Sequence, residues 1–145
     1  MSIVSQDKVR LNVKVNDKYE AIRIAGQLLV DAGHVPSEYV DKMIERERSL
    51  STYMGGGLAI PHGTNEAKAL IKSTGLSVVI VPDGVDFGEG ERANLIIGIA
   101  AEGDEHLEIL TNVAMLVSEE EDMKRILNAS SEAELVDIIE SGLDA

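Results

Sequence analysis

The sequence predicts an α/β domain in which helices flank a small, mixed β-sheet. Residues 76–81 and 95–100 form nearly continuous apolar runs, rich in Val and Ile and too short for good helices, which is typical of buried strands. Residues 9–15 alternate apolar and polar side chains, the pattern of a half-buried strand. Together with a short strand at 58–60, the expected order is one strand, two helices, three strands and three helices. Because strands follow one another in the middle of the chain, a doubly wound βαβ fold is not expected.

Two helices are expected after the first strand. Asp17 and Glu20 have the spacing of a capping box at the start of the first helix, and Gly33 is its expected C-terminal stop. Pro36 fits the first turn of the second helix. The apolar face of that second helix is expected to contain Tyr39, Val40, Met43 and Ile44.

Three successive glycines, Gly55 to Gly57, lead into the short strand at 58–60. Glycine loses more backbone entropy on folding than any other residue, so this run indicates a strained turn or a close approach of the backbone to something. Pro61 cannot donate a sheet hydrogen bond and should end or edge the strand. His62 is therefore expected at the exit of the strand.

The second half of the chain is expected to end in three helices. Residues 82–84 (Pro-Asp-Gly) are predicted to form a turn and residues 88–91 a mobile loop. Asp104 is the expected N-cap of the first of the three helices. Capping-box spacings predict the starts of the other two: Ser118 with Glu121, and Ser131 with Glu134. The helix after Asp104 is expected to carry the apolar stripe Leu107, Leu110, Val113, Ala114 and Val117.

Length and composition limit the classes of function. The chain has 145 residues and no linker or repeat divides it, so residues 1–145 are expected to form a single domain. It contains no cysteine, which excludes disulfides, thiolate metal sites and thiol catalysis. The net charge is −13, and residues 102–145 hold 13 acidic and only 2 basic side chains, so nucleic acid would be repelled. No apolar run is long enough to span a membrane, and the N-terminus lacks the pattern of a signal peptide.

Three histidines are candidates for chemistry. His34 follows the expected end of the first helix, where a cation is favourable, and is interpreted as structural. His62 lies at a strand exit and His106 in the first turn of a helix, and two strands of one sheet can bring these positions together. Two histidines without a third ligand are a weak metal signal, and neither a nucleophile elbow nor a Gly-x-x-x-x-Gly-Lys phosphate loop is present. A structural role for His62 and His106 stays open at this point.

His62 also has features of a phosphoryl acceptor. Such a residue needs one accessible, neutral ring nitrogen while a hydrogen bond fixes the other. The helix start around Asp104 would offer free backbone N–H groups to the phosphoryl oxygens, and a nearby arginine would offer bidentate contacts. Asp104, Glu105 and Glu108 would repel a phosphate unless they point outward, which we expect.

Four segments together resemble a known family. They read Gly-Leu-Ala-Ile-Pro-His-Gly-Thr at 57–64, Pro-Asp-Gly-Val at 82–85, Ile-Gly-Ile-Ala-Ala at 97–101 and Glu-His-Leu at 105–107. From about residue 11 to 139 the chain is similar to the enzyme IIA component of the bacterial phosphoenolpyruvate-dependent sugar phosphotransferase system (PTS), mannitol/fructose type. Glu-Ala-Lys at 66–68 and the Pro-Asp-Gly-Val segment resemble the mannitol branch more than the fructose or nitrogen-regulatory branches.

The resemblance implies a phosphotransferase component with no cofactor and no metal. His62 would accept a phosphoryl group from the phosphocarrier protein HPr, as a tele-phosphohistidine, and pass it to a cysteine of the mannitol IIB component during uptake. His106 matches a second active-site histidine that assists without carrying the phosphate. Arg46 matches a functional arginine at the end of the second helix, although the charged run at 45–48 is by itself typical of a solvated surface. The resemblance assigns no role to Arg48.

The resemblance also has consequences for location and partners. Without a cysteine or a membrane span, the chain is expected to be a free-standing cytoplasmic IIA protein that serves a membrane IIBC transporter on other chains. The glycines at 55–57, with Gly63, would leave His62 uncrowded for two partner proteins. Two alternatives stay open: a regulatory protein of the nitrogen-regulatory branch, which would control a partner through its phosphorylation state, and a binding domain without phosphoryl chemistry.

Overall fold

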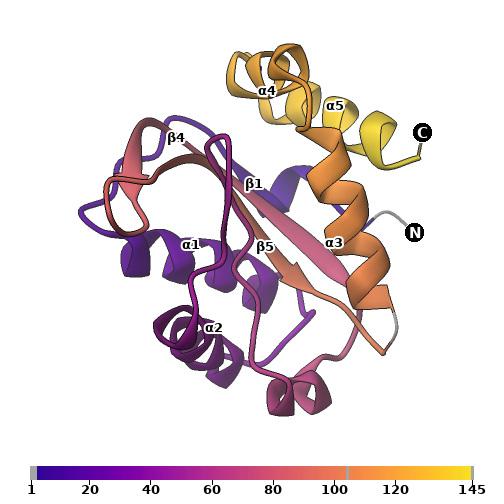
Figure 1. The fold of residues 1–145 in the computed structure, drawn as a ribbon. Helices are drawn as coiled ribbons and strands as arrows, with labels where there is room; N and C mark the ends of the chain where they lie inside the picture. Colours follow the sequence, from indigo (N-terminus) through magenta and orange to yellow (C-terminus); the bar gives the residue numbers. More distant parts are fainter. Residues whose placement is uncertain (1–2, 104, 145) are drawn as a thin grey trace.

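The computed structural model describes residues 3–103 and 105–144, and it contains a five-stranded mixed sheet between two layers of helices (Figure 1). The strands lie in the order β1-β4-β5-β3-β2. They are β1 (Val9–Arg10), β2 (Tyr53–Gly55), β3 (Leu58–Ala59), β4 (Gly75–Asp86) and β5 (Arg92–Ala100). The α-helices are α1 (Lys18–Asp31), α2 (Glu38–Ser49), α3 (Glu105–Leu116), α4 (Glu120–Leu127) and α5 (Glu132–Asp144). Two 3₁₀ helices span Gln6–Lys8 and Glu66–Leu70. The prediction of a mixed sheet flanked by helices is confirmed.

Both faces of the sheet are buried, each beneath its own group of helices. Side chains along β4 alternate between the faces: Leu76 and Val78 pack in the cluster that contains α3, α4 and α5, whereas Val79 and Val81 pack with α1 and α2. Figure 1 shows the same division, with α1 and α2 on one side of the sheet and α3, α4 and α5 on the other. A strand that is buried on both sides needs no polar face, which accounts for the continuous apolar runs of β4 and β5.

The first strand is shorter than predicted. β1 contains only two residues because Asn12 has a φ of 55°, in the left-handed region, where an extended strand cannot continue. The alternation of the sequence nevertheless marks the inward side, since Val13 and Val15 pack against the cluster beneath α1 and α2. Val13 N donates to Ile80 O at 3.0 Å, so the segment follows β4 without forming a regular ladder.

Helix α1 begins and ends where the sequence predicts. The Asp17 carboxylate accepts from Glu20 N at 2.9 Å, and the Glu20 carboxylate accepts from Asn16 N at 3.0 Å. These two bonds satisfy backbone donors that the helix itself cannot reach. Gly33 stops the helix with a φ of 83°, and His34 N donates back to Leu29 O.

Two predictions about the strands are wrong. Residues 82–84 continue β4 instead of turning, and the pairing with β5 shifts register between Ile80 and Val85, where Gly84 adopts a φ of 77°. The chain reverses at residues 88–91, where Phe87 N donates to Glu91 O. A connection was expected over residues 49–54, leading into the glycines, but Tyr53–Gly55 form β2, which pairs antiparallel with β3.

The stripe predicted for α3 is partly correct. Val113 is buried, and Leu110 and Val117 pack against the same cluster, whereas Leu107 is 74% exposed. The helix also buries Ile109 and Leu116. Asp104, its predicted N-cap, lies outside the described residues.

One of the two C-terminal capping boxes forms. Ser131 Oγ accepts from Glu134 N at 3.1 Å, as predicted for α5. Ser118 does not cap α4: its hydroxyl donates to Met115 O, and α4 begins one residue later, with Glu119 as N-cap and no side-chain capping bond.

Candidate functional site

The sheet places His62 beside the C-terminal end of its central strand. β3 runs parallel to β5 and ends at Ala59, and three residues later His62 forms an isolated parallel bridge with Ile99. Ile99 N donates to Pro61 O at 2.9 Å, a bond that needs only the carbonyl of the proline. The prediction that Pro61 ends the strand and leaves His62 at its exit is confirmed.

Helix α3 brings His106 to the same place. It starts five residues after the end of β5, and His106 lies in its first turn. The rings of His62 and His106 meet edge to face, with centroids 4.9 Å apart and an interplanar angle of 62°. Residues 44 positions apart in sequence thus share one site, because β3 and β5 are neighbours in the sheet.

A cavity of about 330 Å³ is lined by His62, His106 and residues at the end of α2. Arg46, in the last turn of α2, lines it, and the Arg46 guanidinium donates to Leu50 O just beyond the helix. The resemblance singled out three residues, His62, His106 and Arg46, and the cavity brings these three together. Thr64, Lys68 and Tyr39 line it as well.

The His62 ring has a defined tautomer. Nδ1 lies 2.8 Å from Ile60 O, and a carbonyl oxygen can only accept, so Nδ1 carries the proton. The Nε2 lone pair is then the nucleophilic position of the ring, and none of the described residues forms a hydrogen bond with it.

Burial and neighbouring cations keep both rings uncharged at neutral pH. Burial lowers the pKa of His62, and Arg46 and Lys68 lower it further against the opposing effect of the Ile60 hydrogen bond. Burial, followed by His62, Lys68 and Arg46, lowers the pKa of His106 to about 4. The site therefore combines neutral imidazoles with fixed positive charge, which favours an anion without protonating its acceptor.

Tyr39 fixes the backbone on either side of the site. Its hydroxyl donates to Ile99 O at 3.1 Å and accepts from Gly63 N at 2.9 Å. A Cβ on Gly63 would come within 2.7 Å of the Tyr39 ring, closer than real Cβ contacts. Gly63 thus has no side chain because the His62 segment packs directly on Tyr39.

Glu47 corrects the expectation that the charged end of α2 is a solvated face. It is 2% exposed, accepts from Thr52 N and Thr52 Oγ1, and forms an ion pair with Lys18 at 3.0 Å. Burial raises the pKa of Glu47, but the Thr52 hydrogen bonds outweigh this and lower it overall. The network holds the end of α2, and so the position of Arg46. Arg48 points elsewhere and stacks over the Tyr19 ring.

His34 lies in a different environment, away from the cavity of His62. Its Nε2 is 2.7 Å from Lys8 Nζ and its Nδ1 is 2.8 Å from Ser73 Oγ. Burial and the Lys8 ammonium lower the pKa of His34, so the ring is neutral and Nε2 accepts from Lys8. The structural role expected for His34 agrees with these contacts, but the expected reason, a cation at a helix end, is wrong.

The glycines at 55–57 do not adjoin His62. They form the turn between β2 and β3, and Leu95 N donates to Gly57 O, at the opposite end of β5 from Ile99. Their φ values of 98°, 62° and 91° lie in the left-handed region, which explains three glycines in a row. The expectation that this run leaves His62 uncrowded is wrong.

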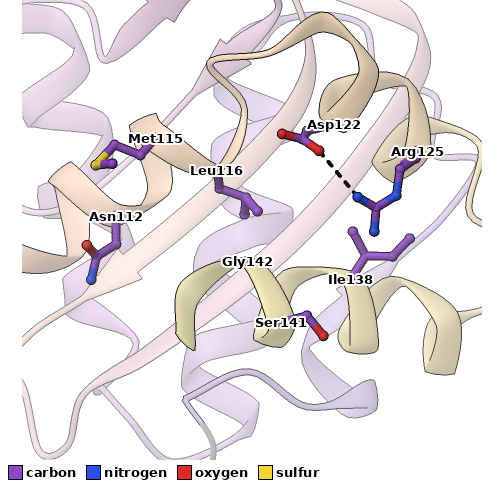
Figure 2. Close-up of a pocket in the computed structure, with 8 residues that line it drawn as sticks. All are labelled: Asn112, Met115, Leu116, Asp122, Arg125, Ile138, Ser141 and Gly142. Atoms are coloured by element: carbon purple, nitrogen blue, oxygen red, sulfur yellow. Dashed lines mark hydrogen bonds and ion pairs between the residues drawn. The ribbon is translucent and has the colours of Figure 1, made fainter. Parts of the chain in front are cut away.

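A second cavity, of about 470 Å³, lies among α3, α4 and α5 (Figure 2). Leu116 and Ile138 give it apolar walls, and an Asp122–Arg125 ion pair of 3.3 Å lies beside them. It contains no histidine and no nucleophile with an activating partner. Among residues 3–103 and 105–144, no group of three His, Cys, Asp or Glu side chains could hold a metal ion. Within the same residues, no helix has the length and apolar character to cross a membrane.

Comparison with known proteins gives the family. Residues 2–142 match the family model "Phosphoenolpyruvate-dependent sugar phosphotransferase system, EIIA 2". The chain belongs to this family. It is an enzyme IIA component, a phosphoryl carrier of the PTS, as the resemblance indicated.

The relatives match the chain over almost its whole length. A mannitol-specific phosphotransferase enzyme IIA component of Geobacillus stearothermophilus is 48% identical over 139 residues, which cover 96% of each protein. The IIA chain in a complex of mannitol IIA with phosphorylated mannitol IIB from Escherichia coli superposes with a TM-score of 0.89 at 36% identity and covers 95% of this chain and 97% of that one. The nitrogen regulatory protein IIA-Ntr of Neisseria meningitidis superposes with a TM-score of 0.82 at 26% identity, covering 94% and 96% of the two chains.

Three residues of the cavity did not emerge from the sequence as site residues. Thr64 lies in the Pro-His-Gly-Thr segment, and its position two residues after His62 could have indicated that it is a site residue. Lys68 lies in the Glu-Ala-Lys segment, which had served only to distinguish the branches. Tyr39 was assigned to the apolar face of α2, and nothing in the pattern indicated that its hydroxyl would join two backbone segments.

Proposed function

We propose that His62 is the phosphoryl acceptor of this IIA protein. It takes the group from phosphorylated HPr and passes it to the cysteine of a mannitol IIB component. The observation that supports this most is the geometry of the ring: Nδ1–H donates to Ile60 O, no described residue bonds to Nε2, and the ring lines a cavity with Arg46 and Lys68. The tele nitrogen expected from the resemblance is this Nε2.

The transfer needs no proton at the acceptor. The Nε2 lone pair of His62 forms a bond to phosphorus while the bond from phosphorus to the donor atom breaks, and the donor keeps that electron pair. Protonated His62 would have no lone pair, so the lowered pKa of the ring keeps it reactive at neutral pH. In the second step the cysteine sulfur of IIB attacks the same phosphorus, and the pair returns to Nε2.

Arg46, His106 and the start of α3 stabilise the charge on the phosphoryl oxygens. Arg46 brings a permanent positive charge and donors in a planar fork. The first turn of α3 has backbone N–H groups without intrahelical partners and the positive end of the helix dipole. Glu105 and Glu108 are both exposed and neither lines the cavity, in agreement with the expectation that they point outward.

The relatives support the mannitol branch. The Geobacillus stearothermophilus protein at 48% identity is mannitol-specific, whereas the nitrogen regulatory protein shares 26% identity. The Escherichia coli complex contains IIA bound to phosphorylated IIB, which supports the same kind of partner for this chain. We propose that residues 1–145 act as one IIA domain in the cytoplasm.

The function is tested by incubating the protein with phosphoenolpyruvate, enzyme I and HPr. The expected product has gained one phosphoryl group, mapped to His62 by mass spectrometry, acid-labile, and transferable to mannitol IIB. A label on His34 or His106 would refute the site. Labelling of His62 without transfer to any IIB protein, together with binding of another protein that depends on phosphorylation, would favour the regulatory alternative.

A further inference from the structure

The hydroxyl of Thr64 is buried and has no hydrogen-bond partner among the described residues. Among residues 3–103 and 105–144, Thr64 Oγ1 is the one buried side-chain oxygen or nitrogen in this state. Buried polar groups are nearly always hydrogen-bonded, because leaving one unpaired destabilises the fold. Such a hydroxyl needs an explanation beyond folding.

The place of Thr64 supplies that explanation. It lines the same cavity as His62, His106 and Arg46, two residues along the chain from His62. His62 pairs with Ile99 as a strand residue does, and side chains two positions apart in an extended segment point to the same side. Gly63, between them, packs against the Tyr39 ring and is held by the Tyr39 hydroxyl.

Of the hydroxyl-bearing residues that line the cavity, Thr64 is the nearest to His62 along the chain. Arg46 and Lys68 bring charge on long side chains, and the carboxylates of Glu45 and Glu66, which also line the cavity, can only accept. A threonine hydroxyl can donate to an oxygen anion, and a buried one is already oriented by its surroundings, so little entropy is lost when the anion arrives.

We propose that Thr64 Oγ1–H donates a hydrogen bond to an oxygen of the phosphoryl group on Nε2 of His62. The inference rests on the proposed function, because it assigns Thr64 to the group that His62 carries. The hydroxyl is unpaired in the free protein and paired in the phosphorylated one. Thr64 therefore favours the phosphorylated form and the transfer of the group in both directions, without a covalent role of its own.

The test compares Thr64→Val, which removes the hydroxyl at nearly constant shape, with Thr64→Ser, which keeps it. Phosphorylation by phosphorylated HPr should slow about 10- to 100-fold in Thr64→Val, the loss expected for one hydrogen bond to a charged group. Thr64→Ser should recover most of the rate. Thr111→Val is the matched control, since the Thr111 hydroxyl is exposed on α3 and bonds only Leu107 O; it should transfer at the wild-type rate.

Two further readouts separate contact with the phosphoryl group from a structural role. The urea midpoint of unphosphorylated Thr64→Val should equal or exceed that of the wild type, because the substitution removes an unpaired buried hydroxyl. The ³¹P resonance of the phosphorylated protein should shift in Thr64→Val and not in Thr111→Val. Thr64→Ala, should the valine variant fold poorly, is expected to show the same slowing.

The inference and the proposed function fail in different ways. Wild-type transfer rates and an unchanged ³¹P shift in Thr64→Val, with the label still on His62, would overturn the role of Thr64 alone. A wild-type protein that is not labelled on His62 would overturn the proposed function itself.

Discussion

His34 and His62 are both neutral and at least partly buried, yet their ring nitrogens are used in opposite ways. Lys8 and Ser73 occupy the two nitrogens of His34, at 2.7 and 2.8 Å. Ile60 O accepts a hydrogen bond from Nδ1–H of His62, and the ring lines a cavity. The Lys8 ammonium donates directly to the His34 ring. Arg46 and Lys68, in contrast, line the cavity of His62, where they can contact an anion bound to the ring. The proposed carrier histidine thus differs from the structural one by an Nε2 lone pair that none of the described residues occupies.

The largest effect is expected from exchanging the two histidines for glutamine in turn. His62→Gln should lose all phosphorylation by HPr, since no lone pair remains on a basic ring nitrogen. His34→Gln should still be phosphorylated, with a lower free energy of unfolding because the Lys8 ammonium loses the ring acceptor Nε2 and keeps only Ile3 O as an acceptor among the described residues. Intact-mass spectra after incubation with phosphoenolpyruvate, enzyme I and HPr measure the phosphorylation of both variants. Phosphorylation of His62→Gln would contradict the proposed contrast between His62 as acceptor and His34 as structural residue.

A smaller effect is expected from the arginines of α2. Arg46→Ala should slow transfer about 10- to 100-fold, since it removes a charged donor from the phosphoryl group. Arg48→Ala is the matched control: its guanidinium stacks on Tyr19, 5.4 Å from the ring centroid, and the transfer rate should stay near the wild-type value. Rapid-quench kinetics with radiolabelled phosphorylated HPr measure the rates. Equal slowing in both variants would mean that only the overall charge of α2 matters.

Gly63→Ala should destabilise the protein and slow transfer. The new Cβ would meet the Tyr39 ring at 2.7 Å, and overpacking of this kind costs about 1–3 kcal/mol. Because Tyr39 also binds Ile99 O, its displacement would move the backbone that positions His62. Gly56→Ala provides the contrast: an added Cβ there meets no atom within 4 Å, although its φ of 62° strains any L residue. It should lower stability, seen in urea unfolding, and leave transfer intact.

The smallest effect concerns pH. His106 has a pKa of about 4 in the folded protein against about 6.5 when exposed, so between these values the unfolded chain binds more protons. The free energy of unfolding should therefore fall as the pH decreases from 6.5 towards 4. His106→Asn should show a shallower fall. Urea unfolding at several pH values gives the free energy of unfolding of both proteins. The difference between the two proteins cancels the contribution of the carboxylates. Equal slopes of this free energy against pH would contradict the lowered pKa of His106.

The sequence predicted the parts of the fold and site that depend on local pattern. Apolar runs placed β4 and β5, and Pro61 placed His62 at a strand exit, because each rests on neighbouring residues. β2 was missed since its Tyr-Met-Gly segment runs straight into a glycine turn and has no alternating pattern. The family resemblance, and not the spacing, singled out Arg46.

Contacts between distant segments could not be predicted. Lys8 and His34 are 26 residues apart, and only their contact shows that His34 is neutral rather than a cation at a helix end. The Tyr39 hydroxyl and the buried Glu47 join segments in the same way. That the Thr64 hydroxyl lacks a partner among the described residues emerges only once the residues around it have been placed in space.

The two outer strands of the sheet have a consequence for how the protein meets others. β1 contains two residues and β2 three, so neither border offers a long row of free backbone groups. Short outer strands are a known defence against strand-by-strand self-association and fibril growth. A carrier that meets two partners in succession must release each one. Short outer strands help, because contact at the edge of the sheet then forms no stable strand pairing.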